Sequence, residues 1–298
     1  MFCDPLRPRG PAVNFQSLAA SSHIRRMPAP MPPIAAEFVD AEYSALERAW
    51  LRNIFRRAGL PMEAYKPESL RRRKPACLRA LGAGSMVEAR LLLSRRPDRL
   101  DRAMSALLIG VTDFFRDPPV FEALEGLLKT GPVARPPRVW SAGCSNGAEL
   151  YSIAMLLDRA GMLEGARLLG SDCRLDAVAQ AAEGCYDLSA LASIPPDLQA
   201  AYCQVEGSKF RVGDRLRRAV RFVQANVLAS TEPGCWDLIL CRNLAIYLQP
   251  AAVGQLWLAL EGALAPGGLL MLGKAERPTG TARLRPAGPM IWRRTEGR

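Results

Sequence analysis

The residues best placed for chemistry are a short glycine loop and an acid that follows it. Gly143 and Gly147 bound the loop G-C-S-N-G, which lies between a predicted strand and a predicted helix. Glycines there let the backbone approach a ligand closely, and the start of the helix offers unpaired N–H groups. Asp172 ends the next predicted strand, 25 residues beyond Gly147, where an acid accepts hydrogen bonds from both ribose hydroxyls. The pair predicts a site for an adenosine-containing cofactor, with a tight turn and a helix cap as the alternative.

Other common site chemistries find little support. The glycine spacing is G-x-x-x-G, which differs from the dinucleotide pattern G-x-G-x-x-G, and no P-loop pattern occurs. The eight cysteines include no C-x-x-C, so we expect no thiolate metal site. The single histidine, His23, lies in a proline-rich segment, so we expect no Ser-His or Cys-His dyad in the folded body.

The glycine loop and the acid need a sheet that holds them at one edge. Apolar runs of strand length alternate with apolar patterns of helical spacing. The predicted strands cover 138–142, 166–170, 236–241 and 269–272, and the predicted helices cover 149–160, 175–183 and 250–264. This alternation predicts βαβ units and a doubly wound parallel sheet, an α/β fold. In such sheets ligands bind at the carboxyl ends of the strands, where Gly143 and Asp172 fall.

The rest of the chain divides by composition. Residues 1–36 carry seven prolines and are predicted to be a disordered tail. From 37 to 110 apolar residues recur at helical spacing, which predicts a small all-helical N-terminal domain with helices over 67–81, 85–94 and 97–109. Residues 111–137 contain Gly-Pro and Pro-Pro pairs and are expected to be a linker or lid before the sheet domain, 138–298.

Charge is concentrated in the predicted helical domain. The formal net charge is +11, and residues 42–108 hold fifteen Lys or Arg against seven Asp or Glu. Such a region attracts nucleic acid, an anionic membrane surface or an acidic protein, and a solvated helical face is the alternative. No run of about 18 apolar residues occurs, so we expect no membrane insertion. No secretory signal stands at the start, which predicts a cytoplasmic protein with reduced cysteines.

Five segments, in order, resemble the motifs of one known family. From Arg138, R-V-W-S-A-G-C-S-N-G-A-E-L-Y-S-I-A-M is similar to R-V-W-S-A-G-C-S-T-G-E-E-P-Y-S-I-A-M of the CheR-type protein-glutamate methyltransferases of bacterial chemotaxis. T-D-F-F-R-D at 112–117 resembles T-x-F-F-R-D, and V-R-F-V-Q-A-N-V-L at 220–228 resembles v-x-F-x-x-x-N-L-L. W-D-L-I-L-C-R-N-L-A-I-Y at 236–247 resembles F-D-L-I-x-C-R-N-x-x-I-Y, and P-G-G at 266–268 with Glu276 resembles P-G-G-x-L-x-L-G-x-x-E.

The resemblance implies a class I methyltransferase-like fold with a small β-subdomain inserted at about 186–222. It implies S-adenosylmethionine as the cofactor, and as the substrate glutamates on the acidic methylation helices of a receptor protein. Carried over position by position, it assigns cofactor binding to Thr112, Gly143, Gly147, Glu149, Asp172, Asn226, Asn243 and Leu244. It assigns catalysis, on the substrate side, to Arg116 and Tyr247.

This inventory suits methyl transfer to a carboxylate. A glutamate is already ionised at neutral pH and needs no general base, and the cofactor carries the hard chemistry. A guanidinium such as Arg116 orients an incoming carboxylate through two hydrogen bonds. The alternatives are a structural salt bridge for Arg116 and a packed ring with a hydrogen-bonded hydroxyl for Tyr247.

Three positions depart from the family pattern near the expected cofactor pocket. Gly110 replaces an asparagine, Ala148 replaces an acid and Leu150 replaces a proline. A catalytically weakened or inactive module that binds the cofactor or the receptor is therefore the second function considered. Nucleic acid is not an expected partner, because the chain has no array of aromatic residues for base stacking. No feature of the sequence indicates an oligomeric state.

Overall fold

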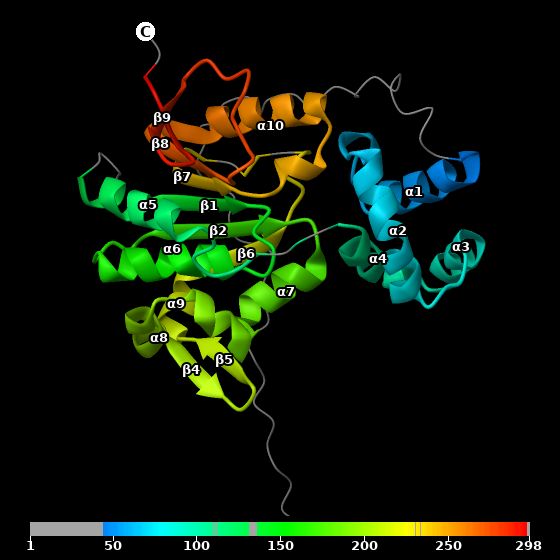
Figure 1. Ribbon diagram of the computed structural model, residues 1–298, viewed down its shortest axis with the longest axis horizontal. Coiled ribbons are helices and arrows are strands. Elements are labelled where there is room, and N and C mark those ends of the chain that lie inside the picture. Colours follow the sequence, from blue (N-terminus) through cyan, green and yellow to red (C-terminus); the bar gives the residue numbers. More distant parts are fainter. Residues whose placement is uncertain are drawn as a thin grey trace, which may run out of the picture. The chain divides into compact units, whose positions relative to one another are not determined.

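The computed structural model describes residues 44–108, 110, 112–130, 136–229, 231–232 and 234–296. The predicted tail, 1–36, lies outside these ranges. At the centre of the described chain is a seven-stranded sheet of order β6-β2-β1-β7-β8-β10-β9 (Figure 1). Its strands are β1 (Arg138–Ala142), β2 (Arg167–Asp172), β6 (Val220–Gln224), β7 (Trp236–Cys241), β8 (Leu264–Leu272), β9 (Leu284–Gly288) and β10 (Ile291–Arg294).

The five strands from β6 to β8 run parallel, and β10 pairs antiparallel with both β8 and β9. The first strand, β1, lies at the middle of the five parallel strands, and later strands are added outward on both sides of it, which is the doubly wound arrangement. The expected class I methyltransferase-like α/β fold is therefore confirmed. The hairpin of β9 and β10 was not predicted, because Pro286 and the exposed Arg285 interrupt the alternation of β9.

Helices cover both faces of the sheet because successive residues of a strand point to opposite sides. On β1, Val139 packs in the core shared with helices α5 (Pro118–Thr130) and α6 (Ala148–Arg159). Trp140 packs in the core shared with helix α10 (Pro250–Ala263). Figure 1 shows α10 on one side of the strands and α5 and α6 on the other. Helix α7 (Leu175–Glu183) follows β2 and contacts β2 and β6.

The described residues before Gly110 form helices, as the apolar spacing predicts. They are α1 (Ala45–Arg57), α2 (Pro67–Leu81), α3 (Met86–Arg95) and α4 (Leu100–Leu107), with short 3-10 turns at Met62–Ala64 and Pro97–Arg99. The hydroxyls of Ser44 and Ser85 cap α1 and α3 by accepting from the N–H groups of Glu47 and Glu88.

Contacts of Tyr65 and Lys66 join these helices to the carboxyl edge of the sheet. Tyr65 forms an isolated antiparallel bridge with Leu248. The Lys66 N–H donates to the Tyr247 carbonyl at 2.9 Å, and the Lys66 ammonium donates to the Ile246 carbonyl at 2.9 Å. The turn that carries Tyr247 is thus held from the helical side of the protein.

The small inserted sheet differs from its expected extent. It consists of β3 (Cys185–Asp187), β5 (Lys209–Val212) and β4 (Cys203–Glu206), paired antiparallel in that order, with α8 (Pro196–Tyr202) between β3 and β4. Helix α9 (Asp214–Ala219) leads from it to β6. The expected insert of 186–222 therefore ends too late, because Val220–Gln224 pairs with β2 in the main sheet. A short apolar run has the same appearance in either sheet, and only the pairing partner distinguishes them.

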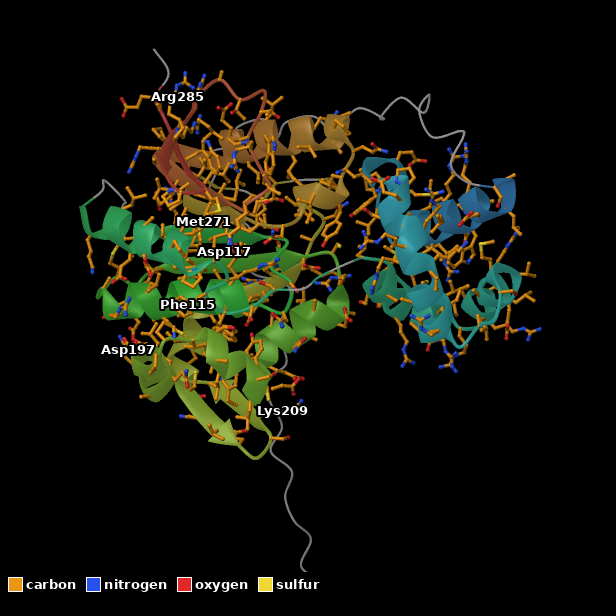
Figure 2. All side chains as sticks on the ribbon, in the orientation of Figure 1. Phe115, Asp117, Asp197, Lys209, Met271 and Arg285 are labelled. Carbon is orange, nitrogen blue, oxygen red and sulfur yellow. The ribbon has the colours of Figure 1, made fainter. Side chains whose placement is uncertain are left out.

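The expected linker, 111–137, also differs, because it contains the 13-residue helix α5. Pro118 and Pro119 stand at the start of this helix, where proline is tolerated because the first N–H groups have no intrahelical partner. The charged side chains of Asp197 and Lys209 on the insert and of Arg285 on β9 are exposed (Figure 2). No helix within the described ranges has both the length and the apolarity needed to cross a membrane.

Candidate functional site

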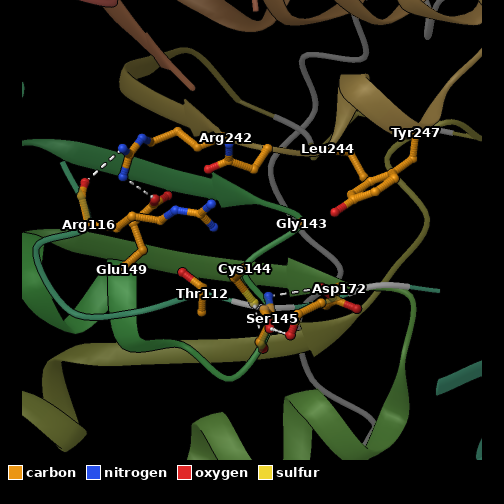
Figure 3. A pocket seen from close by; sticks show the side chains of 12 residues that line it. Thr112, Arg116, Gly143, Cys144, Ser145, Glu149, Asp172, Arg242, Leu244 and Tyr247 are labelled. Atoms are coloured by element: carbon orange, nitrogen blue, oxygen red, sulfur yellow. Dashed lines mark hydrogen bonds and ion pairs between the residues drawn. The ribbon is translucent and has the colours of Figure 1, made fainter. Parts of the chain in front are cut away.

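The carboxyl ends of β1, β2 and β7 open onto one pocket (Figure 3). Parallel strands present these ends at the same edge, so loops far apart in sequence meet there. The pocket has a cavity volume of about 50 Å³. It is lined by Gly110, Thr112, Arg116, Gly143, Cys144, Ser145, Glu149, Asp172, Arg242, Asn243, Leu244 and Tyr247.

The glycine loop after β1 turns tightly back over the end of β2. The N–H groups of Gly143 and Cys144 both donate to the Ser171 carbonyl, at 2.8 and 2.9 Å. Gly143 has a φ of 76°, and a Cβ there would lie 3.4 Å from the Leu244 side chain, inside the pocket. Gly147 has a φ of 83° but faces away: its Cβ would lie 2.8 Å from both Ala181 and Phe222.

The segment before α5 is anchored by two aromatic rings. Phe114 packs edge-on against Tyr186 at 4.8 Å between ring centroids, and Phe115 packs against Phe121 at 5.1 Å. With both rings buried in the core, Thr112 and Arg116 on either side line the pocket. The T-x-F-F-R spacing therefore alternates core anchors with pocket residues.

Asp172 receives hydrogen bonds at both carboxylate oxygens. Its Oδ2 accepts from the Ser145 N–H at 2.9 Å and from the Arg174 Nη2 at 3.4 Å. Its Oδ1 accepts from the Arg174 N–H at 3.0 Å and from the Arg174 Nε at 3.1 Å. The Arg174 Nη2 also donates to the Ser145 hydroxyl at 3.1 Å. Arg174 was not predicted as a site residue, although it lies only two positions after Asp172.

A buried guanidinium organises the opposite end of the pocket. Arg242, whose side chain is 1% exposed, donates to Glu149 at 2.8 Å and to Asp117 at 2.7 Å, and it also donates to the Arg116 carbonyl at 2.7 Å. The Lys274 ammonium contacts the other Asp117 oxygen at 2.7 Å. Arg242 was missed as a site residue, although it stands between Cys241 and Asn243 in the C-R-N motif.

The two acids on Arg242 respond differently to this environment. Burial raises the pKa of Glu149, and the neighbouring Arg242 opposes that shift only in part. Burial acts on Asp117 in the same direction, but the hydrogen bond from Lys274 and the charge of Arg242 outweigh it and hold the pKa of Asp117 below its ordinary value. Asp117 is therefore the more firmly ionised partner of Arg242.

Glu276 holds the loop that follows β7. Its Oε2 accepts from the N–H groups of Asn243 at 2.9 Å and Gly273 at 2.8 Å, and its Oε1 accepts from the Ala245 N–H at 2.8 Å. Asn243 has a φ of 59°, a left-handed conformation that its neighbours must maintain. Glu276 is 2% exposed, so these three hydrogen bonds are shielded from water.

A second, more apolar cavity adjoins the first and shares Asp172, Leu244 and Tyr247 with it. Its volume is also about 50 Å³, and its other lining residues are Tyr65, Ser69, Leu70, Leu107, Leu108, Cys173 and Arg174. Because the two cavities meet at Asp172, one elongated ligand with an apolar and a polar end matches both.

Of the ten predicted site residues, eight line the first pocket and two do not. Gly147 is the N-cap residue of α6, and its lack of a side chain allows close packing against Ala181 of α7 and Phe222 of β6. Asn226 follows β6, next to the Ala225 N–H that donates to the Asp172 carbonyl at 3.0 Å. The Asn226 Nδ2 is buried without a hydrogen-bond partner in the described structure, a donor available to a ligand.

These residues fit S-adenosylmethionine. The acid at the end of β2 suits a ribose, the apolar cavity beside it suits a flat base, and the charged end with Glu149, Arg116 and Arg242 suits a zwitterionic amino acid. The Asn226 Nδ2, which has no hydrogen-bond partner in the described structure, lies near the end of β2, because the neighbouring Ala225 N–H donates to the Asp172 carbonyl.

The family model "CheR methyltransferase, SAM binding domain" matches residues 110–285. The chain therefore belongs to the CheR methyltransferase family, whose matched domain binds S-adenosylmethionine. The resemblance seen in the motifs is confirmed.

Sequence similarity to individual proteins supports this assignment. The chemotaxis protein methyltransferase of Salmonella typhimurium is 32% identical over 239 residues, which cover 75% of this chain and 80% of that protein. The "Probable biofilm formation methyltransferase WspC" of Pseudomonas putida is also 32% identical over 239 residues, covering 77% of this chain. This chain spans 56% of the length of WspC and 23% of a longer relative from Rhodobacter capsulatus.

Among solved structures, the chain is similar to the glycopeptide N-methyltransferase MtfA in complex with S-adenosyl-L-homocysteine. The two are 19% identical, the match covers 58% of this chain and 59% of that one, and the TM-score is 0.33. A similarity of this size has no bearing on the substrate.

Proposed function

We propose that this protein transfers a methyl group from S-adenosylmethionine to glutamate carboxylates of a chemoreceptor-like protein in the cytoplasm. The observation that carries the proposal is the single pocket in which Glu149, Asp172, Arg116 and Tyr247 meet, in a chain of the CheR family. The similarity to proteins named chemotaxis protein methyltransferases supports the receptor as the substrate.

In this proposal the cofactor extends across both cavities. Asp172 accepts from its ribose, and Asn226 donates to its base. Glu149 takes its ammonium group, with Thr112 nearby. Gly143, Asn243 and Leu244 provide the wall against which it lies, and Gly147 fixes the loop from behind. These roles require no metal ion, and the described residues contain no group of His, Cys, Asp and Glu suited to one.

The bound cofactor supplies an activated methyl group on its sulfonium. The protein must orient the incoming carboxylate and exclude water, because an ionised glutamate is already a nucleophile. Arg116 suits the first task, since its backbone carbonyl is held by Arg242 and its guanidinium lies at the pocket. Tyr247 borders both cavities and suits the second.

The basic helix α2 is the proposed docking surface for an acidic receptor helix. Arg71 and Arg72 are exposed, whereas Arg73 donates to the Ala106 carbonyl at 3.0 Å and supports the fold. Charge reversal at Arg71 and Arg72 should therefore weaken methylation of the receptor without changing cofactor affinity. Methylation at low ionic strength that stays at the wild-type rate would remove the docking claim.

A cofactor-binding module without turnover is the second candidate. It is favoured by the small cavity volume of about 50 Å³ and by the four hydrogen bonds that Asp172 already accepts.

The test is transfer of a radiolabelled methyl group to receptor-bearing membranes. A base-labile label indicates a carboxyl ester, and a base-stable label indicates N-methylation and overturns the proposal. Asp172→Ala serves as the variant without transfer. Binding of the cofactor in calorimetry together with no label on any receptor identifies the module instead.

A further inference from the structure

The guanidinium of Arg174 lies on the carboxylate that is expected to receive the ribose. A carboxylate has about four acceptor positions, two on each oxygen. In Asp172 all four are in use, two by the backbone N–H groups of Ser145 and Arg174 and two by the Arg174 side chain. The backbone donors are fixed by the fold, so only the two side-chain bonds are exchangeable.

These two exchangeable bonds match the hydrogen bonds of a vicinal diol. The Nε of Arg174 occupies one position on Oδ1, and its Nη2 occupies one position on Oδ2. The two hydroxyls of a ribose donate to a carboxylate in the same one-to-each-oxygen manner. A ribose and the Arg174 guanidinium therefore cannot bind Asp172 at the same time.

Gly110 provides the space in which the guanidinium rests. A Cβ at position 110 would lie 1.9 to 2.1 Å from three guanidinium atoms of Arg174, far inside van der Waals contact. The Ser145 hydroxyl completes the enclosure, because it donates to the Gly110 carbonyl at 2.8 Å and accepts from Arg174. The Arg174 side chain is only 9% exposed as a result.

We propose that Arg174 is an internal competitor of the cofactor: its guanidinium occupies the ribose-binding positions of Asp172 and must leave them before S-adenosylmethionine binds. Arg174 thereby sets the cofactor affinity of this protein, and Gly110 permits it to do so. The inference concerns the cofactor alone and stands whether or not the substrate is a receptor.

The test is calorimetric titration of the full chain with S-adenosylhomocysteine, which lacks the positive sulfonium and so removes charge repulsion from the comparison. Arg174→Met keeps the volume of the stem and the backbone N–H bond but removes both exchangeable donors. We expect it to lower the Kd about tenfold, or ~1.4 kcal/mol. The matched control is Arg96→Met, which removes an exposed guanidinium paired with Asp98 and should leave the Kd unchanged.

A double-mutant cycle with Gly110→Ala makes the test specific. The added methyl group displaces the guanidinium, so Gly110→Ala should tighten binding in the wild-type background and have no effect in the Arg174→Met background. An Arg174→Met variant that folds and binds S-adenosylhomocysteine as weakly as the wild type, or more weakly, overturns the inference. If the methionine variant does not fold, Arg174→Lys decides, since one ammonium cannot bridge both oxygens: about threefold tighter binding supports the inference, and an unchanged Kd overturns it.

Discussion

Replacing Glu276 by glutamine tests whether one buried carboxylate maintains the loop beside the pocket. The substitution is isosteric, so packing is preserved and only the hydrogen bonds change. The glutamine oxygen can keep the bonds from Asn243 and Gly273, but its NH2 group then faces the N–H of Ala245. One charge-assisted bond is lost, and two buried donors, the Ala245 N–H and the new NH2 group, face each other without an acceptor.

The magnitude follows from these two effects. A hydrogen bond to a charged group contributes roughly 1.5–3 kcal/mol, and an unsatisfied buried donor costs roughly 1–3 kcal/mol. The two overlap, so we expect the free energy of unfolding to fall by about 2–4 kcal/mol. Because Asn243 loses a constraint on its left-handed backbone, the affinity for S-adenosylhomocysteine should fall as well.

The measurement is urea unfolding together with calorimetry. Glu261→Gln is the matched control, because Glu261 is a buried acid on α10 that accepts from one backbone N–H, that of Arg283, and does not line the pocket. It should lower stability less and leave ligand affinity unchanged. If Glu276→Gln unfolds within 0.5 kcal/mol of the wild type, a margin typical of a surface substitution, and binds the ligand equally well, the proposed role of Glu276 is refuted.

Three further predictions follow from single contacts. Lys66→Met removes the ammonium bond to the Ile246 carbonyl and should lower the free energy of unfolding by about 1–2 kcal/mol, measured by urea unfolding. Asp117 has a folded pKa below its unfolded value of about 3.9, so its stabilisation is complete above that pH and is lost as the pH falls through the folded pKa. Asp117→Asn should therefore be less stable than the wild type at pH 7, and thermal unfolding should show the difference closing in acid. Gly147→Ala adds backbone strain and a clash with Phe222 and should be more destabilising than Gly161→Ala, which has positive φ but open space around it; equal losses in urea unfolding would contradict this.

The main elements of the fold were predictable because their signals are local. Apolar runs and helical spacing place β1, β7, α2 and α7 correctly, since each is bounded by glycine, proline or an abrupt change of polarity. What local pattern does not contain is the pairing partner of a strand. For that reason β6 was placed in the insert. Helix α5 was missed for a different reason, because it begins with two prolines and lies in a segment predicted to be a linker.

The site was predictable to the extent that its residues stand at strand ends. Gly143 and Asp172 were found because loops at the carboxyl edge of a parallel sheet converge, whereas Thr112 and Glu149 were assigned from the resemblance to the CheR motifs. Arg174 and Glu276 were missed because their roles depend on which atoms their side chains reach. No spacing rule shows that a guanidinium folds back onto the acid two residues before it, or that one carboxylate collects three backbone N–H groups.

Three buried acids near the pocket differ in the groups that donate hydrogen bonds to them. Glu276 is held by backbone N–H groups, which cannot leave. Glu149 is paired with Arg242, which is also fixed by Asp117 and therefore has little freedom to exchange. Of the three, Asp172 combines backbone donors with donors from one side chain, that of Arg174, which the proposal requires to leave. Because a ligand can displace only a partner that is able to move, Asp172 is the acid at which cofactor binding is controlled.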